Sequence, residues 1–359
     1  MHNNFRNIDK IVFGRGSLKM LDSILAEKRK DNNQYVVFFV DNYFKGKELA
    51  KAIPQHTHDD LIFIDVDPYE PTTEQVDALR DRIMKPKGLP SAIVGMGGGS
   101  IMDLAKAVSL MVTNEGSSMQ YQGLNLIKNP GIYHLGVPTI SGTGAEVSTT
   151  AVLTGPEKKL GLKCEWTPFN QLVLDPELIA TVPADKWFYT GMDTYIHCIE
   201  SETGQLKNAF SHAYAEESLK LCREVYLGLG SGQNPENDDK LMVASLMGGL
   251  SLSYSEVGVV HALSYGLSKI KGEKHCYANC LVFQHLEDYY PEGVAEFRQM
   301  MERNGISLPQ GLSKNWTEAE IRAMSEVAFA LGHMWNHAIG QDWKQKISVN
   351  KIIELYKRM

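Results

Sequence analysis

The first half of the chain alternates between short β-rich runs and segments with helical periodicity. Residues 17–30 and 74–83 repeat their apolar side chains at the spacing of an amphipathic helix. The runs between such segments are short and rich in Val, Ile, Phe and Tyr, which predicts strands. Alternation of this kind predicts βαβ units and a mostly parallel sheet. The predicted strands are residues 11–14, 35–40, 61–66, 92–96 and 133–137.

After Pro183 the pattern changes, because strand-like runs give way to long amphipathic segments. These segments are residues 185–202, 213–229 and 240–256. Polar and glycine-rich stretches between the later segments predict interhelical loops, and Thr317 with Glu320 fits a capping box. We therefore expect an α/β domain with a parallel sheet over residues 1–182 and an all-helical domain over residues 183–359.

Composition limits the classes of function. The chain has 359 residues with a net charge of −7, so it lacks the positive charge of a nucleic-acid-binding protein or of one that binds an anionic membrane surface. No apolar run approaches the ~20 residues that span a bilayer, and the N-terminus lacks the apolar core of a secretory signal. We expect no membrane insertion and a cytoplasmic location. Five scattered Cys residues do not predict a disulfide framework.

One Asp and three His in the second half are spaced so that they can meet at a single cation. Asp193 and His197 are four residues apart and share one face of a helix. His261 opens another helix-like run, and His275 follows fourteen residues later. One carboxylate and three imidazoles suit Zn²⁺ or Fe²⁺. Cys276 and Cys280, beside His275, are either a soft-metal alternative or, as we favour, small buried thiols.

A glycine-rich loop follows the strand predicted at residues 92–96. Gly97, Gly98 and Gly99 lack a Cβ and precede a predicted helix, so their backbone N–H groups can approach a pyrophosphate. Asp41 ends another predicted strand, where a carboxylate can bind a ribose hydroxyl and repel a 2′-phosphate. This acid precedes the glycines instead of following them, which indicates a strand order different from the usual Rossmann fold. Residues 137–148 are rich in Thr, Ser and Gly, which suits polar contacts to a cofactor or simply a turn.

Several motifs together resemble the iron-containing, group III alcohol dehydrogenases, which have the dehydroquinate synthase-like fold. The motifs are GGGSxxDxAK (97–106), PTxxGTGxE (138–146), DPEL (175–178), GxDxxxHxxE (191–200) and the pair His261 and His275. They occur in order over nearly the whole chain. The resemblance implies an N-terminal dinucleotide-binding domain, a C-terminal metal-binding domain and a cleft between them.

The same resemblance implies the roles of individual residues. The metal ligands would be Asp193, His197, His261 and His275. The pyrophosphate loop would be Gly97, Gly98, Gly99 and Ser100, the ribose contact Asp41, and the other cofactor contacts Thr139, Ser141 and Thr143. The implied cofactors are NAD and a divalent metal, Fe²⁺ or Zn²⁺. The implied activity is oxidation of a primary alcohol to an aldehyde, with the metal acting as a Lewis acid and NAD⁺ accepting hydride.

Two features bear on the substrate. Many relatives have a second His four residues after the first C-terminal ligand, where this chain has Tyr265; Tyr265 is either a proton relay or a packing residue. Lys269, Lys271 and Lys274 lie between the last two ligands and either contact an anionic substrate or form a solvated helix end. With these residues the chain looks like the branch that oxidises the C8 hydroxyl of the 3-deoxy-octulosonate sugar of lipopolysaccharide before amination, with O₂ as a further acceptor.

Other functions remain open on the residues alone. One is an NAD-dependent dehydrogenase for a small neutral alcohol or polyol, and another is a dehydroquinate synthase-like lyase that borrows and returns hydride. A protein that has lost catalysis is disfavoured by the intact ligand set and glycine loop. We expect a small-molecule substrate, an anionic sugar, with a homodimer as a further possibility.

Overall fold

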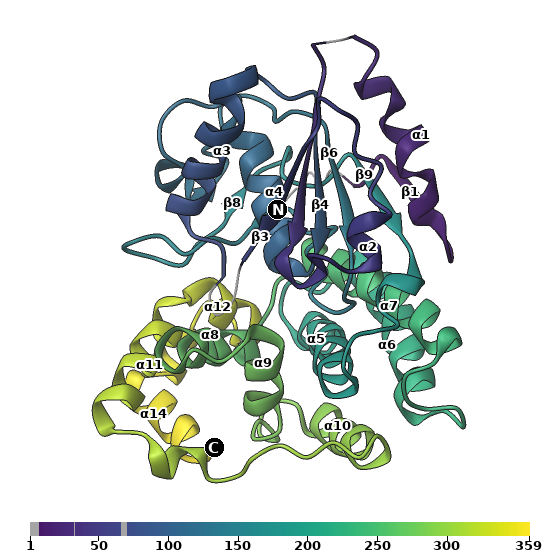
Figure 1. Ribbon diagram of the computed structural model, residues 1–359. Helices are drawn as coiled ribbons and strands as arrows, with labels where there is room; N and C mark the ends of the chain where they lie inside the picture. The colour runs from purple at the N-terminus through teal and green to yellow at the C-terminus, as the bar shows by residue number, and fades with distance from the viewer. Residues whose placement is uncertain (1–6, 32, 66–69) are drawn as a thin grey trace. The chain divides into compact units, whose positions relative to one another are not determined.

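The computed structural model describes residues 7–31, 33–65 and 70–359, and it divides into two compact units (Figure 1). The N-terminal unit comprises residues 1–140 and 144–181, and the C-terminal unit comprises residues 141–143 and 182–359. The short segment 141–143 therefore groups with the helices, whereas the residues before and after it in the chain group with the sheet. Each unit is described by itself below.

A six-stranded, wholly parallel sheet forms the centre of the N-terminal unit. Each predicted strand overlaps an observed one, although Val66, which ends the predicted run 61–66, lies outside the described residues. The fold class predicted from the sequence is confirmed. In spatial order the strands are β1 (Lys10–Phe13), β9 (Gln171–Leu174), β6 (His134–Pro138), β4 (Ala92–Gly97), β2 (Val36–Asp41) and β3 (Asp60–Ile64).

Four strands were not predicted. One is β9, a four-residue strand in a stretch that we had not assigned. The other three form a small second sheet, and each has only two residues, too few to show a period in the sequence. They are β5 (Gly123–Leu124), β8 (Leu162–Lys163) and β7 (Thr150–Ala151).

Helices cover both faces of the six-stranded sheet (Figure 1). Val36, Phe38 and Val40 of β2 share a core with Leu21 and Leu25 of α1 (Leu21–Leu25) on one face. Side chains alternate along a strand, so the equally buried Val37 and Phe39 point to the other face. On that face α4 (Gly99–Met111) packs on β4 and β6, and α3 (Thr73–Lys87) packs on α4. The remaining helix of this unit, α2 (Glu48–Lys51), has a single turn. Burial on both faces explains why β2 is apolar at successive positions.

Residues 182–359 form helices and contain no strand. The capping box predicted at Thr317 and Glu320 is confirmed at the start of α11. The helices are α5 (Ala184–Thr203), α6 (Ala209–Leu227), α7 (Pro235–Tyr254), α8 (Val259–Lys271), α9 (His275–Phe283), α10 (Pro291–Arg303), α11 (Glu318–Ala330), α12 (Gly332–Ile339), α13 (Trp343–Lys346) and α14 (Val349–Lys357).

A search of the described residues for membrane spans found no single helix with the length and apolar character required. The pair α7 and α8 meets the criteria when taken together, but the two helices are bent by 103° at their junction.

A buried ion pair fixes the backbone of residues 145–150, which follow β6 in the chain. Lys106 of α4 is fully buried, and its Nζ lies 2.9 Å from Asp103 Oδ1. The same ammonium donates to the carbonyls of Ala145 and Thr150, at 2.8 and 2.5 Å, and to Ser148 Oγ at 3.0 Å. One cation thus ties residues 145–150 to α4. Burial raises the pKa of the Asp103 carboxyl, and Lys106 opposes that rise.

Replacing Lys106 by Met should therefore destabilise the protein by about 3–5 kcal/mol, because it leaves the Asp103 carboxylate buried without its cation. Urea unfolding followed by circular dichroism measures the change. The double variant Lys106→Met/Asp103→Asn serves as the control and should recover part of the loss. Equal stability of the single variant and the parent would contradict this role of the ion pair.

Candidate functional site

The predicted ribose and pyrophosphate residues meet at the carboxyl ends of three neighbouring strands. Asp41 ends β2 and Gly97 ends β4, and a Cβ built on Gly97 would lie 3.2 Å from Asp41 Cβ. Thr139 follows β6, and its N–H donates to the Gly97 carbonyl at 3.0 Å. The carboxyl edge of a parallel sheet, at the point where the order of successive strands reverses, is where α/β folds bind ligands.

The glycine-rich loop leads directly into α4. Gly98 is the N-cap, and Gly99 and Ser100 form the first turn, whose backbone N–H groups have no partner within the helix. A Cβ on Gly97 would approach Ile101 Cγ1 to 2.5 Å, and one on Gly98 would approach Ile140 Cδ1 to 2.9 Å. A Cβ at Gly97 therefore has no room, whereas one at Gly98 would require the Ile140 side chain to shift. The helix N-terminus that results favours an anion.

The remaining predicted cofactor contacts fall into the other unit. Ser141 and Thr143 group with the helices, whereas Thr139 groups with the sheet. Ser141 is buried, and its Oγ has no hydrogen-bond partner among the described residues.

The four predicted metal ligands converge within the C-terminal unit. Asp193 and His197 come from α5, His261 from the first turn of α8, and His275 from the first residue of α9. The Nε2 atoms of His197 and His261 each lie 3.6 Å from Asp193 Oδ1, and His275 Nε2 lies 3.6 Å from Asp193 Oδ2. One donor atom from each residue lies within 4.8 Å of all the others.

The distances fit a bound cation. A tetrahedral set with metal–ligand distances of about 2.1 Å places its donor atoms about 3.4 Å apart. Asp193, His197 and His261 are buried, and the His275 side chain is 23% exposed, so the cluster is accessible at one ligand.

Burial and the Asp193 charge control the ionisation of the cluster. Burial lowers the pKa of His197 to about 4, which leaves its imidazole neutral near pH 7 and able to act as a ligand. Burial by itself would raise the pKa of Asp193, but the neighbouring imidazoles lower it well below the usual range, so this group is a carboxylate.

Glu200 contacts Nδ1 of His261, the ring nitrogen that does not face the other ligands. It lies on α5 one turn beyond His197, and its Oε2 is 2.5 Å from His261 Nδ1. Its Oε1 accepts from the Val260 N–H at 2.7 Å and from the Tyr290 hydroxyl at 3.4 Å. Burial disfavours protonation of His261, but the Glu200 and Asp193 carboxylates together outweigh it and raise the His261 pKa to about 9. A carboxylate on Nδ1 keeps a proton there, so a metal that binds His261 does so at Nε2, where it displaces a proton.

Sequence reasoning missed this role of Glu200, and it missed Asn279. Glu200 was noticed only as the last letter of a motif, although its spacing of seven from Asp193 places both on one face of α5. Asn279 lies one turn after His275, and its Nδ2 donates to Asp193 Oδ1 at 2.6 Å. Both residues are buried. Their helical spacing from a ligand was the available signal.

The two neighbouring cysteines differ in position. Cys276 Sγ donates to Asp193 Oδ2 at 3.4 Å, whereas Cys280 is buried and contacts the Tyr189 carbonyl at 3.9 Å. Neither belongs to the cluster of four donor residues. All five cysteines are free thiols, so the prediction that they form no disulfide framework is confirmed.

The structure places Tyr265 beside the ligands and separates the three lysines by their environments. The Tyr265 ring centroid lies 5.8 Å from that of His275 and 6.5 Å from that of His261. Lys271 forms an ion pair with Glu320 at 2.8 Å. Lys269 and Lys274 are exposed, near the end of α8 and at the N-cap of α9.

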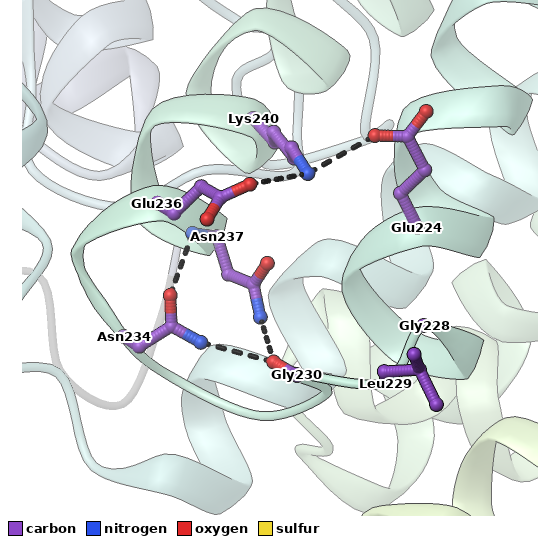
Figure 2. A pocket seen from close by; sticks show the side chains of 8 residues that line it. All are labelled: Glu224, Gly228, Leu229, Gly230, Asn234, Glu236, Asn237 and Lys240. Atoms are coloured by element: carbon purple, nitrogen blue, oxygen red, sulfur yellow. Dashed lines mark hydrogen bonds and ion pairs between the residues drawn. The ribbon is translucent and has the colours of Figure 1, made fainter.

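A pocket of about 230 Å³ at the α6–α7 connection contains none of the predicted site residues (Figure 2). Its polar groups bind one another. Asn234 and Asn237 donate to the Gly230 carbonyl at 3.0 and 2.7 Å, and Lys240 pairs with Glu224 and Glu236 at 3.1 and 2.9 Å. These contacts close the loop, and we assign the pocket no role in the chemistry.

Two family models match the chain. Residues 9–176 match the model described as iron-containing alcohol dehydrogenase. Residues 187–359 match the C-terminal model of the Fe-containing alcohol dehydrogenase family. Together the two models include every predicted metal and cofactor residue.

Curated relatives are oxidoreductases. The chain is 29% identical over 281 residues to an NAD-dependent methanol dehydrogenase of Bacillus methanolicus, covering 77% of this chain and 72% of that protein. It is 33% identical over 177 residues to a sulfoacetaldehyde reductase of Bilophila wadsworthia, covering 48% of this chain and 45% of that protein. The second alignment thus spans less than half of that protein's length. The prediction of an oxidoreductase is confirmed.

Solved structures match over nearly the whole chain. A sulfoacetaldehyde reductase from Bifidobacterium kashiwanohense in complex with NAD⁺ has a TM-score of 0.82 at 21% identity, covering 99% of this chain and 98% of that one. A 1,3-propanediol oxidoreductase has a TM-score of 0.84 at 20% identity, covering 99% of both chains. These matches show a shared fold. The two family models, which match residues 9–176 and 187–359, place this chain in the iron-containing alcohol dehydrogenase family.

Proposed function

We propose that the protein interconverts a primary alcohol and an aldehyde with NAD and a divalent metal held by Asp193, His197, His261 and His275. The observation that supports this most is the convergence of three Nε2 atoms and one buried carboxylate within 4.8 Å. The donor set suits Fe²⁺ or Zn²⁺. A bound divalent ion would supply Lewis acidity that lowers the pKa of an alcohol hydroxyl, and NAD⁺ would accept hydride.

The residues around the ligands have roles of their own in this proposal. Glu200 keeps the His261 proton on Nδ1, so Nε2 presents a lone pair. Asn279 donates to Asp193 Oδ1 and orients that carboxylate. Tyr265, next to His275, can hold or pass the proton of a substrate hydroxyl, or it packs against the imidazole ring.

For the nucleotide, we propose that the α4 N-terminus binds the pyrophosphate through Gly97, Gly98, Gly99 and Ser100. Asp41 would bind a ribose hydroxyl and disfavour NADP through charge repulsion. Thr139, Ser141 and Thr143 would supply further polar contacts. In domain terms, residues 1–182 would bind the nucleotide and residues 183–359 the metal, although the short segment 141–143 groups with the second unit.

For the substrate, we propose an anionic molecule, and more narrowly the C8 hydroxyl of a 3-deoxy-octulosonate sugar of lipopolysaccharide. Lys269 and Lys274 are exposed cations close in sequence to the ligand His275. Lys271 already pairs with Glu320, so it offers less charge to a substrate. A relative that reduces sulfoacetaldehyde, by its name an anionic aldehyde, supports the same substrate class. O₂ as the final acceptor, a homodimer and a cytoplasmic location stay predictions.

A small neutral alcohol is the second candidate, because other relatives are named for methanol and 1,3-propanediol. A lyase that borrows and returns hydride is the third. It differs from both because it forms product without net reduction of NAD⁺.

A substrate panel tests the function. Simple alcohols, polyols and sugar acids are added with NAD⁺, and reduced nicotinamide and O₂ uptake are both followed. We expect NADH to form, or O₂ to be consumed, with an acidic sugar alcohol at a higher kcat/KM than with any neutral alcohol. Preference for methanol or propanediol would contradict the anionic substrate, and product without either signal would indicate the lyase.

Replacing His261 or His275 by Ala should remove bound metal and abolish activity while the circular dichroism spectrum is retained, because three ligands hold the ion less well than four. Elemental analysis of the purified variants measures the metal. His212→Ala is the control, because His212 is an exposed residue of the same unit that pairs with Glu202. Full metal occupancy in both ligand variants would refute the assignment.

Replacing Glu200 by Gln should weaken metal binding by about 10–100-fold, because the amide cannot fix the proton on His261 Nδ1 as a carboxylate does. Competition with a chelator measures the affinity, and the visible spectrum of the Co²⁺-loaded protein reports on ligand geometry. Glu202→Gln, on the same helix, is the matched control, because Glu202 pairs with Lys207 and His212 and not with a ligand. Equal metal affinity in the two variants would contradict the proposal that Glu200 orients His261 for metal binding.

A further inference from the structure

The segment Ser141–Thr143 is attached to the metal-binding unit through Gly142. The Gly142 N–H donates to Ser245 Oγ of α7 at 2.7 Å, and the Gly142 carbonyl accepts from Thr194 Oγ1 of α5 at 2.9 Å. Both hydrogen bonds are buried. One residue is therefore held at both of its backbone groups, by two helices of the same unit.

The segment also lies directly against the backbone of α5. A Cβ built on Gly142 would be 1.9 Å from the carbonyl oxygen of Thr190, one turn before Thr194. The atoms in the way are backbone, which cannot move aside. Glycine is therefore required here for the segment to approach α5.

Thr194 is itself fixed in orientation. It is fully buried and follows the ligand Asp193 in the chain. A Cβ built on Gly248 of α7 would lie 2.9 Å from Thr194 Cγ2, so the methyl group occupies the space left by that glycine. β-Branched side chains have few rotamers. With its methyl group against α7, the Thr194 hydroxyl is directed at Gly142.

Beside Gly142, a buried hydroxyl lacks a partner. Ser141 is 3% exposed, and its Oγ makes no hydrogen bond to any described residue. A buried polar group without a partner is unfavourable unless a ligand supplies one. The hydroxyl that the attached segment presents is thus available to a polar ligand.

We propose that Thr194 and Ser245 are positioning residues for the nicotinamide nucleotide, an inference that rests on the proposed function. By holding Gly142, they fix the hydroxyls of Ser141 and Thr143 relative to α5, the helix that carries two metal ligands. The two hydroxyls would then be held in place for polar contacts to the nucleotide.

The substitution Thr194→Val tests the proposal. It keeps the shape and the methyl group that packs on Gly248 but removes the donor to the Gly142 carbonyl. Titration of the metal-loaded protein with NADH, followed by nicotinamide fluorescence, should show a dissociation constant about tenfold higher. KM for NAD⁺ should rise by a similar factor, while metal content and KM for the alcohol stay unchanged. Thr194→Ser should restore wild-type binding, because it keeps the hydroxyl.

A matched control lies on the same helix. The Thr203 hydroxyl donates to the Ile199 carbonyl near the end of α5, away from the segment. Thr203→Val should leave NADH binding unchanged. Ser245→Ala removes the other hydrogen bond and provides a second test if Thr194→Val folds poorly. It should weaken NADH binding in the same direction.

A double-mutant cycle separates positioning from general destabilisation. Once Ser141→Ala has removed the hydroxyl, adding Thr194→Val should cost less than it does alone, because both changes act on one contact. Full additivity, or a Thr194→Val variant that binds NADH like Thr203→Val, would overturn the proposal. Failure of the wild-type protein to bind NADH would overturn the proposed function and this inference with it.

Discussion

A carboxylate removed from water must be paired with positive charge or with hydrogen-bond donors. In the helical unit, Asp193 is such a carboxylate, and its neighbours come from several helices. It is fully buried, and three imidazole nitrogens lie 3.6 Å from its oxygens. Asn279 and Cys276 donate to it from α9. These groups come from α5, α8 and α9, so the packing of the three helices determines the environment of the Asp193 carboxylate. A divalent ion at the four donors would balance the carboxylate charge and bind the three imidazoles.

Much of this arrangement could be predicted because it follows from local periodicity. Asp193 and His197 are four residues apart on a helix, so their convergence needs no tertiary information. Most strands of the parallel sheet were equally clear, because parallel strands covered on both faces are apolar at successive positions, although the buried β9 was missed. His261 and His275 lie on other helices, so their spacing allowed them to meet the first pair at one cation, and the family resemblance strengthened that expectation.

Other parts of the structure could not be predicted from the sequence, and the physical reason differs from one part to the next. The three strands of the small sheet have two residues each and cannot display a period. Asn279 was missed because an amide is rarely singled out near a metal, although its Nδ2 lies 2.6 Å from Asp193 Oδ1 and within 3.3 Å of two ligand imidazoles. The division between Thr139 and Ser141 was also hidden. Nothing in a run of Ser, Thr and Gly indicates that two neighbouring hydroxyls pack with different units, because that depends on space left by Gly142 against α5.

One helix accounts for most of the site. A residue in α5 rises about 1.5 Å above the preceding one, so Asp193 and Glu200 are separated by about 10 Å along a single rigid element. Thr194 turns toward another side of the same helix and holds Gly142. The helix is in turn held where Gly191 meets α6, since a Cβ there would lie 1.7 Å from the Tyr226 hydroxyl. The glycine that begins the GxDxxxHxxE motif is thus explained by packing, and it belongs to the support of the site and not to its chemistry. The ligands and their carboxylate support therefore all lie on helices and not on loops, which suits a site whose donors must be placed to within a fraction of an ångström.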